Sequence, residues 1–309
     1  PDGKRLLITG YEGRVEVRDL ASGNVIFPLI GHSGSIETGR YSSDGKLIVT
    51  IAWDGTVKVW DSQTGALIHS LPTGINWPVM ADFSSDTKYF FSAAYNGTVR
   101  LWETSTGKMT SEYRGIPSEQ NLPVFSPDSK NFAVPNAGDS VNVYEIATGA
   151  NIATLYLFSE EPCNISGVHY SDDGSKLMVT FFQSNPTIWR TADHELLQVI
   201  FSMEALVGTA NFNPDGNSAV FGDYHGKIIT VDVESGKQLS NLAGKTVSVN
   251  SANFNPDGDK IVATYDNDSL KILDVLTGKA RSINPGESIV SWFSGFSPDG
   301  KKILIPGMD

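Results

Sequence analysis

The sequence has a single cysteine, Cys163, which excludes an intrachain disulfide and a zinc site built from cysteines. No apolar run approaches the roughly 20 residues that a membrane-spanning helix needs, so no membrane segment is expected. Basic residues are also scarce, because 23 Lys and Arg stand against 35 Asp and Glu and give a formal net charge of −12. This balance argues against binding nucleic acid through its phosphates and suits a basic protein partner.

Signals of catalysis or metal binding are equally poor. The sequence has no Gly-Lys phosphate loop, no Gly-x-Ser-x-Gly elbow and no paired carboxylates in a distinctive context. The histidines show no metal-ligand spacing, and the Asp-Gly turns lack the carboxylate density of a calcium loop. The histidines are His32, His69, His169, His194 and His225. We therefore expect no enzyme activity, no metal and no cofactor, and interpret Cys163 as an incidental thiol.

What the chain has in abundance is one repeated motif, best seen as Ser43-Asp44-Gly45-Lys46. Its aspartate recurs at positions 2, 44, 86, 128, 173, 215, 257 and 299, so the interval is 42 residues throughout except for one interval of 45. A spacing this regular indicates one supersecondary unit used repeatedly. Asp can bond its own backbone and Gly accepts a positive φ, so the motif is typical of a hairpin turn between two strands.

One repeat, residues 36–71, shows the unit most clearly. Residues 36–42 are expected to form a short strand a, and residues 46–52 an almost continuously apolar strand b. After the Asp54-Gly55 turn, residues 56–61 alternate polar and apolar as strand c, and residues 66–71 form strand d. Four strands in about 42 residues, with glycine-containing turns and no helical period, predict a blade of a β-propeller.

The repeats resemble those of the WD-repeat family, which end strand c with Trp-Asp and carry Gly-His before strand a. The second repeat has both pairs, Gly31-His32 and Trp60-Asp61. Elsewhere the end of strand c is degenerate, as in Trp102-Glu103 and Tyr144-Glu145, yet the resemblance covers the whole chain. It implies an all-β fold of four-stranded antiparallel blades in a single domain over residues 1–309.

The strand count predicts seven blades. Seven b-c-d sets begin near residues 4, 46, 88, 130, 176, 218 and 260, and seven a strands lie near 36–42, 77–84, 121–126, 165–171, 207–213, 247–254 and 289–297. Pairing of residues 289–297 with residues 4–9 would close the ring and remove free sheet edges. Residues 301–307 duplicate the pattern of residues 4–10, so we expect one copy to take the closing position and the other, with the rest of 301–309, to pack elsewhere. An eight-bladed ring, with its first and last blades incomplete, is the alternative.

Four polar or aromatic residues of the second repeat match a hydrogen-bonded tetrad of the family: His32, Thr50, Asp54 and Trp60. The set superficially resembles a Ser-His-Asp triad. A hydroxyl on a central strand beneath a tryptophan has no access to a substrate, however, so we interpret the tetrad as structural. In the other repeats the Asp54 position holds Glu12, Asn96, Gly138, Ser184, His225 and Asn267.

The position before that turn residue is aromatic in four of seven repeats: Tyr11, Trp53, Tyr95 and Tyr224. The resemblance to WD-repeat propellers implies that these turns lie at the rim of the face that carries the d–a loops, where partners usually bind. Amphipathic aromatic residues are good interface anchors, so we expect them to bind a partner, Tyr11, Trp53 and Tyr95 forming one arc. The alternative is that each ring only covers its neighbouring loop.

The d–a loop at residues 158–164 carries the three residues that lengthen one interval to 45. Glu160 and Glu161 in this insertion would suit a basic partner, unless the loop is only a neutral length variation.

Together these features predict a non-enzymatic module that binds a protein or peptide on the face formed by the b–c and d–a loops. We expect it to bind neither nucleic acid nor membrane, to be cytoplasmic and to be part of a larger multidomain chain. The rival is an enzymatic or ligand-binding propeller of the quinoprotein or lactonase type, whose site would need charged side chains meeting in the central channel. Strand a would line that channel, and its residues are mostly apolar or small.

Overall fold

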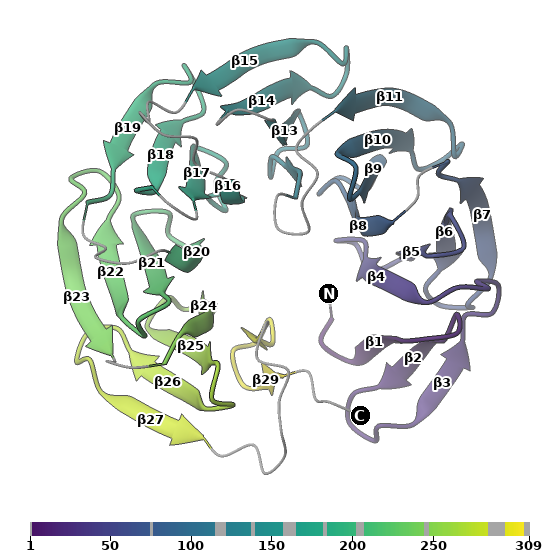
Figure 1. Cartoon of the computed structure of the whole chain (residues 1–309). Coiled ribbons are helices and arrows are strands. Elements are labelled where there is room, and N and C mark those ends of the chain that lie inside the picture. Colours follow the sequence, from purple (N-terminus) through teal and green to yellow (C-terminus); the bar gives the residue numbers. More distant parts are fainter. Residues whose placement is uncertain are drawn as a thin grey trace. The chain divides into compact units, whose positions relative to one another are not determined.

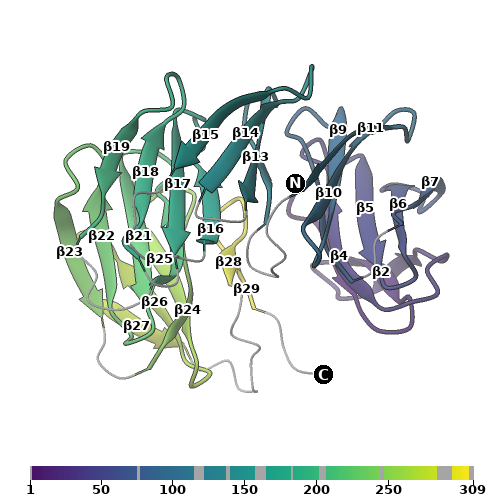
Figure 2. The same cartoon turned by 45° about the horizontal axis from the view of Figure 1, so that its top comes forward.

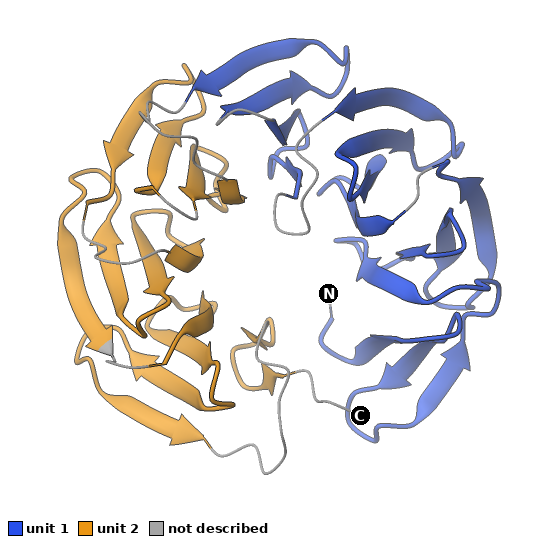
Figure 3. Ribbon diagram, viewed as in Figure 1, with its two compact units in different colours: residues 1–156 blue, residues 157–309 orange. Residues whose placement is uncertain are grey.

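The computed structural model describes residues 2–74, 77–114, 122–136, 140–156, 165–181, 184–201, 207–243, 247–283 and 294–305. This part of the chain contains 29 β-strands and no helix, and hence no helix that could cross a membrane. The chain divides into two compact units, residues 1–156 (unit 1) and residues 157–309 (unit 2), which Figure 3 colours separately. Each unit is a series of consecutive antiparallel sheets (Figures 1 and 2).

Unit 1 holds one three-stranded sheet followed by three four-stranded sheets. The first is β1 (Arg5–Thr9), β2 (Val15–Asp19) and β3 (Val25–Pro28). The second is β4 (Ile36–Tyr41), β5 (Leu47–Ala52), β6 (Thr56–Asp61) and β7 (Leu67–Pro72). The third is β8 (Pro78–Phe83), β9 (Tyr89–Ala94), β10 (Thr98–Glu103) and β11 (Met109–Arg114). The fourth is β12 (Val124–Phe125), β13 (Asn131–Asn136), β14 (Ser140–Glu145) and β15 (Asn151–Tyr156).

Unit 2 holds three four-stranded sheets followed by a two-stranded one. The first is β16 (Ile165–Tyr170), β17 (Lys176–Phe181), β18 (Thr187–Arg190) and β19 (Leu196–Val199). The second is β20 (Val207–Phe212), β21 (Ser218–Asp223), β22 (Ile228–Asp232) and β23 (Gln238–Ala243). The third is β24 (Val249–Phe254), β25 (Lys260–Tyr265), β26 (Leu270–Asp274) and β27 (Ala280–Ile283). The last is β28 (Gly295–Phe296) with β29 (Ile303–Leu304).

The core lies between successive sheets. In unit 1, Val49 and Val59 of one sheet pack with Phe83 and Phe90 of the next. In unit 2, Val220 of the sheet that begins at β20 packs in one cluster with Ile261 of the sheet that begins at β24. Because the middle strands are covered on both faces, they read as continuous apolar runs, whereas the last strand of each sheet is an exposed edge.

The Ser-Asp-Gly turn has the hydrogen bonds that its residue types predict. Ser42 Oγ donates to Asp44 Oδ1 (2.7 Å), and the same carboxylate oxygen accepts from the Lys46 N–H (3.0 Å). Gly45 has φ of +70°, a conformation in which a Cβ is unfavourable. Turns of successive sheets also touch, since the Asp86 N–H donates to Ser129 Oγ (2.9 Å). The 42-residue spacing therefore brings equivalent turns into register.

The predicted strand count is confirmed, since the seven b-c-d sets and the seven a strands are all present. The predicted closing pair is not seen. Gly295 of β28 pairs with Leu304 and Phe296 pairs with Ile303, so β29, from the duplicated segment near the C-terminus, takes the place beside β28. Among the described strands β1 is hydrogen-bonded to β2 and not to β28. Closure of the ring through residues 4–9 therefore stays a prediction.

Candidate functional site

In unit 1 the b–c turns and the d–a connections meet at one end of the sheets. The Trp53 N–H donates to the Ser35 carbonyl (2.9 Å), and the Tyr95 N–H donates to the Trp77 carbonyl (2.9 Å). The Ile36 N–H likewise donates to the Gly10 carbonyl (3.1 Å). We call this end the loop face; it comprises residues 10–14, 29–35, 53–55, 73–74, 77 and 95–97.

Just beneath the loop face, the structure brings His32, Thr50, Asp54 and Trp60 into one hydrogen-bonded chain. Trp60 Nε1–H donates to Thr50 Oγ1 (2.9 Å), and Thr50 Oγ1 lies 2.8 Å from His32 Nε2. His32 Nδ1 lies 2.8 Å from Asp54 Oδ2. The directions are consistent if Nδ1 carries the imidazole proton and Thr50 donates to Nε2. The chain ties the d–a connection to strands β5 and β6.

The two titratable members of the tetrad have shifted pKa values. Burial lowers the pKa of His32, and this effect outweighs the neighbouring Asp54 carboxylate, so the imidazole is neutral at pH 7. Burial opposes ionisation of Asp54, but hydrogen bonds from Thr56, the Ser33 N–H and His32 outweigh it and lower the pKa of Asp54 to about 2. With its hydroxyl group bound between an indole and a neutral imidazole, Thr50 is fully buried and has no path to a substrate.

Acid should weaken this tetrad in a window set by Asp54. The folded pKa lies below the unfolded value of 3.8, so the stabilisation is present above pH 3.8 and is lost as the pH falls toward 2. Between pH 5 and pH 3 we expect Asp54 to account for about 1 kcal/mol of lost stability. Urea unfolding of the wild type and of Asp54→Asn across this range checks it, because the difference between them should narrow by that amount. A difference independent of pH would contradict the ionised, hydrogen-bonded Asp54.

Other sheets keep only fragments of this chain. In the sheet β8–β11, Trp102 Nε1–H donates to Ser92 Oγ (2.9 Å), and among the described residues the Asn96 side chain accepts one hydrogen bond, from the Thr98 N–H (3.0 Å). In the sheet β16–β19, Trp189 Nε1–H donates to Thr187 Oγ1 on its own strand (3.0 Å).

The aromatic residues of the loop face are exposed, and two of the predicted three belong to one cluster. Trp53 and Tyr95 lie on neighbouring sheets, and the ring of Trp77 lies between them. The Trp53–Trp77 centroids are 5.6 Å apart and the Trp77–Tyr95 centroids 6.2 Å. Tyr11, on the turn of the preceding sheet, is 84% exposed and has no ring contact within the described residues.

Trp77 is the residue that the sequence analysis missed. We expected it to begin strand a at residues 77–84, but β8 starts at Pro78 and Trp77 has φ of +64° outside the strand. A comparison at the 42-residue offset could have found it, because Trp77 stands where the preceding repeat has Ser35. Both residues accept the backbone hydrogen bond from the next b–c turn.

The remaining predicted partner-binding residues lie elsewhere. Tyr224 is on the β21–β22 turn of unit 2 and is 42% exposed. Glu160, Glu161 and Cys163 lie outside the described residues. Among the residues that are described, no three His, Cys, Asp or Glu side chains gather in a way that could hold a metal ion.

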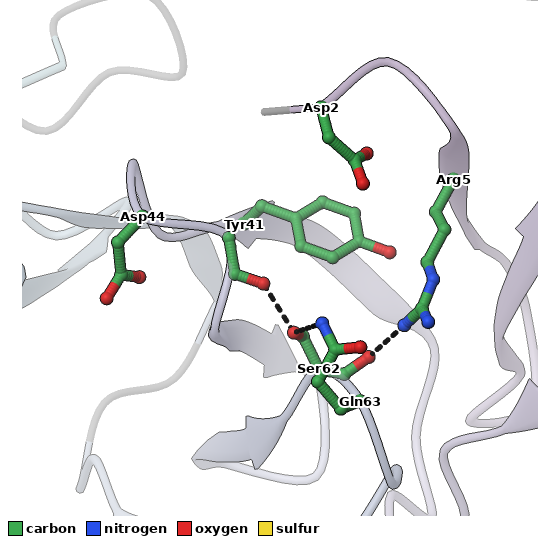
Figure 4. A pocket seen from close by; sticks show the side chains of 7 residues that line it. Asp2, Arg5, Tyr41, Asp44, Ser62 and Gln63 are labelled. Atoms are coloured by element: carbon green, nitrogen blue, oxygen red, sulfur yellow. Dashed lines mark hydrogen bonds between the residues drawn. The ribbon is translucent and has the colours of Figure 1, made fainter.

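A small cavity lies at the opposite end of unit 1, beside the first two a–b turns (Figure 4). Arg5 Nη1–H donates to the Ser62 carbonyl (2.8 Å), and burial raises the pKa of Tyr41. The cavity has a volume of about 110 Å³, which is enough for a few water molecules. It is lined by Asp2, Arg5, Tyr41, Asp44, Gly45, Ser62 and Gln63. The Arg5 guanidinium offsets one of the two carboxylates, Asp2 and Asp44, and we assign the cavity no ligand.

Comparison with known proteins finds similarity to one repeat family and to one solved structure. Residues 23–61, 72–103 and 236–274 match the WD domain, G-beta repeat, a family of short repeats. The crystal structure of the C-terminal WD40 domain of Sif2 is similar to the chain with a TM-score of 0.84 and 15% sequence identity. The similarity covers 99% of this chain and 90% of that one. The search of curated proteins found no match.

These matches define an all-β protein with the propeller fold of four-stranded antiparallel blades. Three segments of the chain match the WD-repeat model and the fold is that of a WD40 domain, which confirms the resemblance drawn from the Trp-Asp and Gly-His pairs. WD40 domains commonly serve as protein-interaction scaffolds.

Proposed function

We propose that the protein is a non-enzymatic interaction module that binds a protein or peptide on the loop face of unit 1. The observation that carries this proposal is the row of exposed rings, because soluble proteins rarely leave large aromatic groups clustered in water without a partner. Trp53, Trp77 and Tyr95 are 51%, 61% and 44% exposed.

The scaffold beneath the rings supports the proposal. The tetrad holds the second sheet and its d–a connection together, and backbone hydrogen bonds join each b–c turn to the connection beside it. A rigid support reduces the conformational entropy lost on binding. Tyr11, Tyr224, Glu160 and Glu161 are candidates for additional partner contacts, and the net charge of −12 favours a basic partner.

Alanine substitution of the arc tests the proposal. We expect the triple variant Tyr11→Ala, Trp53→Ala, Tyr95→Ala to lose its partners in affinity capture, because buried aromatic anchors carry most of the binding energy of an interface. Capture is quantified by mass spectrometry, with circular dichroism to establish that the variant is folded. Met109→Ala is the matched control, since Met109 is 43% exposed on the outer strand β11 of the same unit. Identical capture by the wild type and the triple variant would disprove binding at this face.

A further inference from the structure

The cluster of Trp53, Trp77 and Tyr95 is a continuous aromatic surface rather than three separate rings. Trp77 lies tilted against both neighbours, at 49° to Trp53 and 43° to Tyr95. Each ring is half-exposed, so faces or edges of all three remain open to a ligand. Flat π-surfaces of this kind attract cations as well as apolar groups.

The backbone conformation of Trp77 is unfavourable for so large a side chain. Its φ of +64° belongs to the left-handed region, where a bulky residue is an outlier. The hydrogen bond from the Tyr95 N–H to the Trp77 carbonyl holds it there. An exposed ring contributes little to folding that would offset this cost, and strained residues gather at binding sites. The conformation therefore points to a role of the indole in recognition.

A carboxylate lies directly beside the cluster. Trp53 Nε1–H donates to Glu37 Oε2 (2.9 Å), and Glu37 is an exposed residue of β4. The bond fixes the negative charge next to the indole that contacts Trp77.

The cations near the loop face have partners of their own. Lys58 of β6 packs against Gly31 of the loop face, but its ammonium group donates to Ser70 Oγ. Arg14 pairs with Glu16 (2.9 Å) and Arg100 pairs with Glu112 (2.9 Å), while Arg114 lies at the end of the outer strand β11. Glu37 is thus a carboxylate hydrogen-bonded directly to the aromatic cluster, and it favours a positively charged ligand group there.

We propose that the aromatic cluster binds an arginine side chain of the partner, with its guanidinium stacked on Trp77 and its charge balanced by Glu37. A guanidinium suits this surface because it is planar, stacks on aromatic faces and is more weakly hydrated than an ammonium group. This inference rests on the proposed function and adds the chemical class of the side chain that is recognised.

The test uses the full chain and a short probe, the peptide acetyl-Gly-Arg-Gly-amide. Its neutral counterpart carries citrulline, which keeps the shape of arginine but not its charge. Indole Nε1–H signals are followed by NMR in ¹⁵N-labelled protein and assigned from the spectra of Trp53→Phe and Trp77→Phe. We expect the signals of Trp53 and Trp77 to shift saturably with the arginine peptide, at least about tenfold more tightly than with the citrulline peptide. The signals of the buried Trp60, Trp102 and Trp189 should stay in place.

Two variants separate recognition from folding. Glu37→Gln should lower the affinity for the arginine peptide about three- to tenfold without changing the affinity for the citrulline peptide. Trp77→Gly should abolish the difference in affinity between the two peptides. It should leave the protein at least as stable as the wild type, because glycine accepts the positive φ. Met109→Ala should bind like the wild type. Equal shifts with both peptides, the absence of any shift, or a lysine probe that binds more tightly than arginine would overturn the proposal.

Failure of this inference is distinguishable from failure of the proposed function. If the triple alanine variant loses its captured partners while Glu37→Gln and the citrulline probe have no effect, the loop face binds a partner without reading an arginine. If the triple variant keeps every partner, both proposals are wrong.

Discussion

Replacing Asp54 by alanine is expected to lower the free energy of unfolding by about 2–4 kcal/mol. The carboxylate accepts hydrogen bonds from His32 Nδ1–H (2.8 Å), the Ser33 N–H (3.0 Å) and the Thr56 N–H (2.9 Å). Alanine would leave these donors without an acceptor in a site where the Asp54 side chain is only 9% exposed. Urea unfolding followed by the fluorescence of the buried tryptophans measures the change.

Asn96→Ala is the matched control for Asp54→Ala. Asn96 occupies the same turn position one repeat later, but within the described residues its side chain accepts a single hydrogen bond, from the Thr98 N–H (3.0 Å). Its removal should cost about 1 kcal/mol or less. If the two alanine variants were equally stable, the tetrad would not be the fixed support of the loop face that we describe.

Replacing Gly13 by alanine should destabilise the protein strongly. Gly13 has φ of +77°, and a Cβ there would lie 2.2 Å from the carbonyl oxygen of His32. Backbone cannot move aside as a side chain can, so the d–a connection that carries His32 would be displaced. We expect a loss of about 3 kcal/mol or more, which combines the strain of a left-handed residue with overpacking.

The equivalent glycine of the next repeat separates these two effects. Gly55 has φ of +76°, yet a Cβ there would meet nothing within 4 Å. Gly55→Ala should therefore cost only the left-handed backbone strain, about 1–2 kcal/mol. Thermal unfolding of both variants gives the comparison. A smaller loss for Gly13→Ala than for Gly55→Ala would contradict the close approach of the turn to His32.

The regular part of this structure could be predicted because a single pattern encodes it eight times. The Asp44 turn and the apolar strand that follows it determine the strand pairing. That pairing sets Thr50 opposite Lys58 and Ile48 opposite Trp60, which brings Thr50 Oγ1 within hydrogen-bond distance of the Trp60 indole. The hydrogen-bonded chain of the tetrad follows from residue type once the register is known.

Two features of the structure could not be predicted from the repeated pattern. Residues 4–10 and 301–307 have the same order of basic and apolar residues, so the sequence alone does not decide which copy pairs with β28. Trp77 lies in a connection without a repeated side-chain period, and its position depends on a positive φ that sequence rules assign to glycine. The aromatic surface was therefore predicted at Trp53 and Tyr95 without the ring that joins them.

The most direct test of the loop face as a binding site is photo-cross-linking from single positions. A benzoylphenylalanine placed at Tyr95 should cross-link the captured partner, whereas the same residue placed at Met109 on the outer strand of the same sheet should not. Cross-links to the partner from position 109 but not from position 95 would contradict the account.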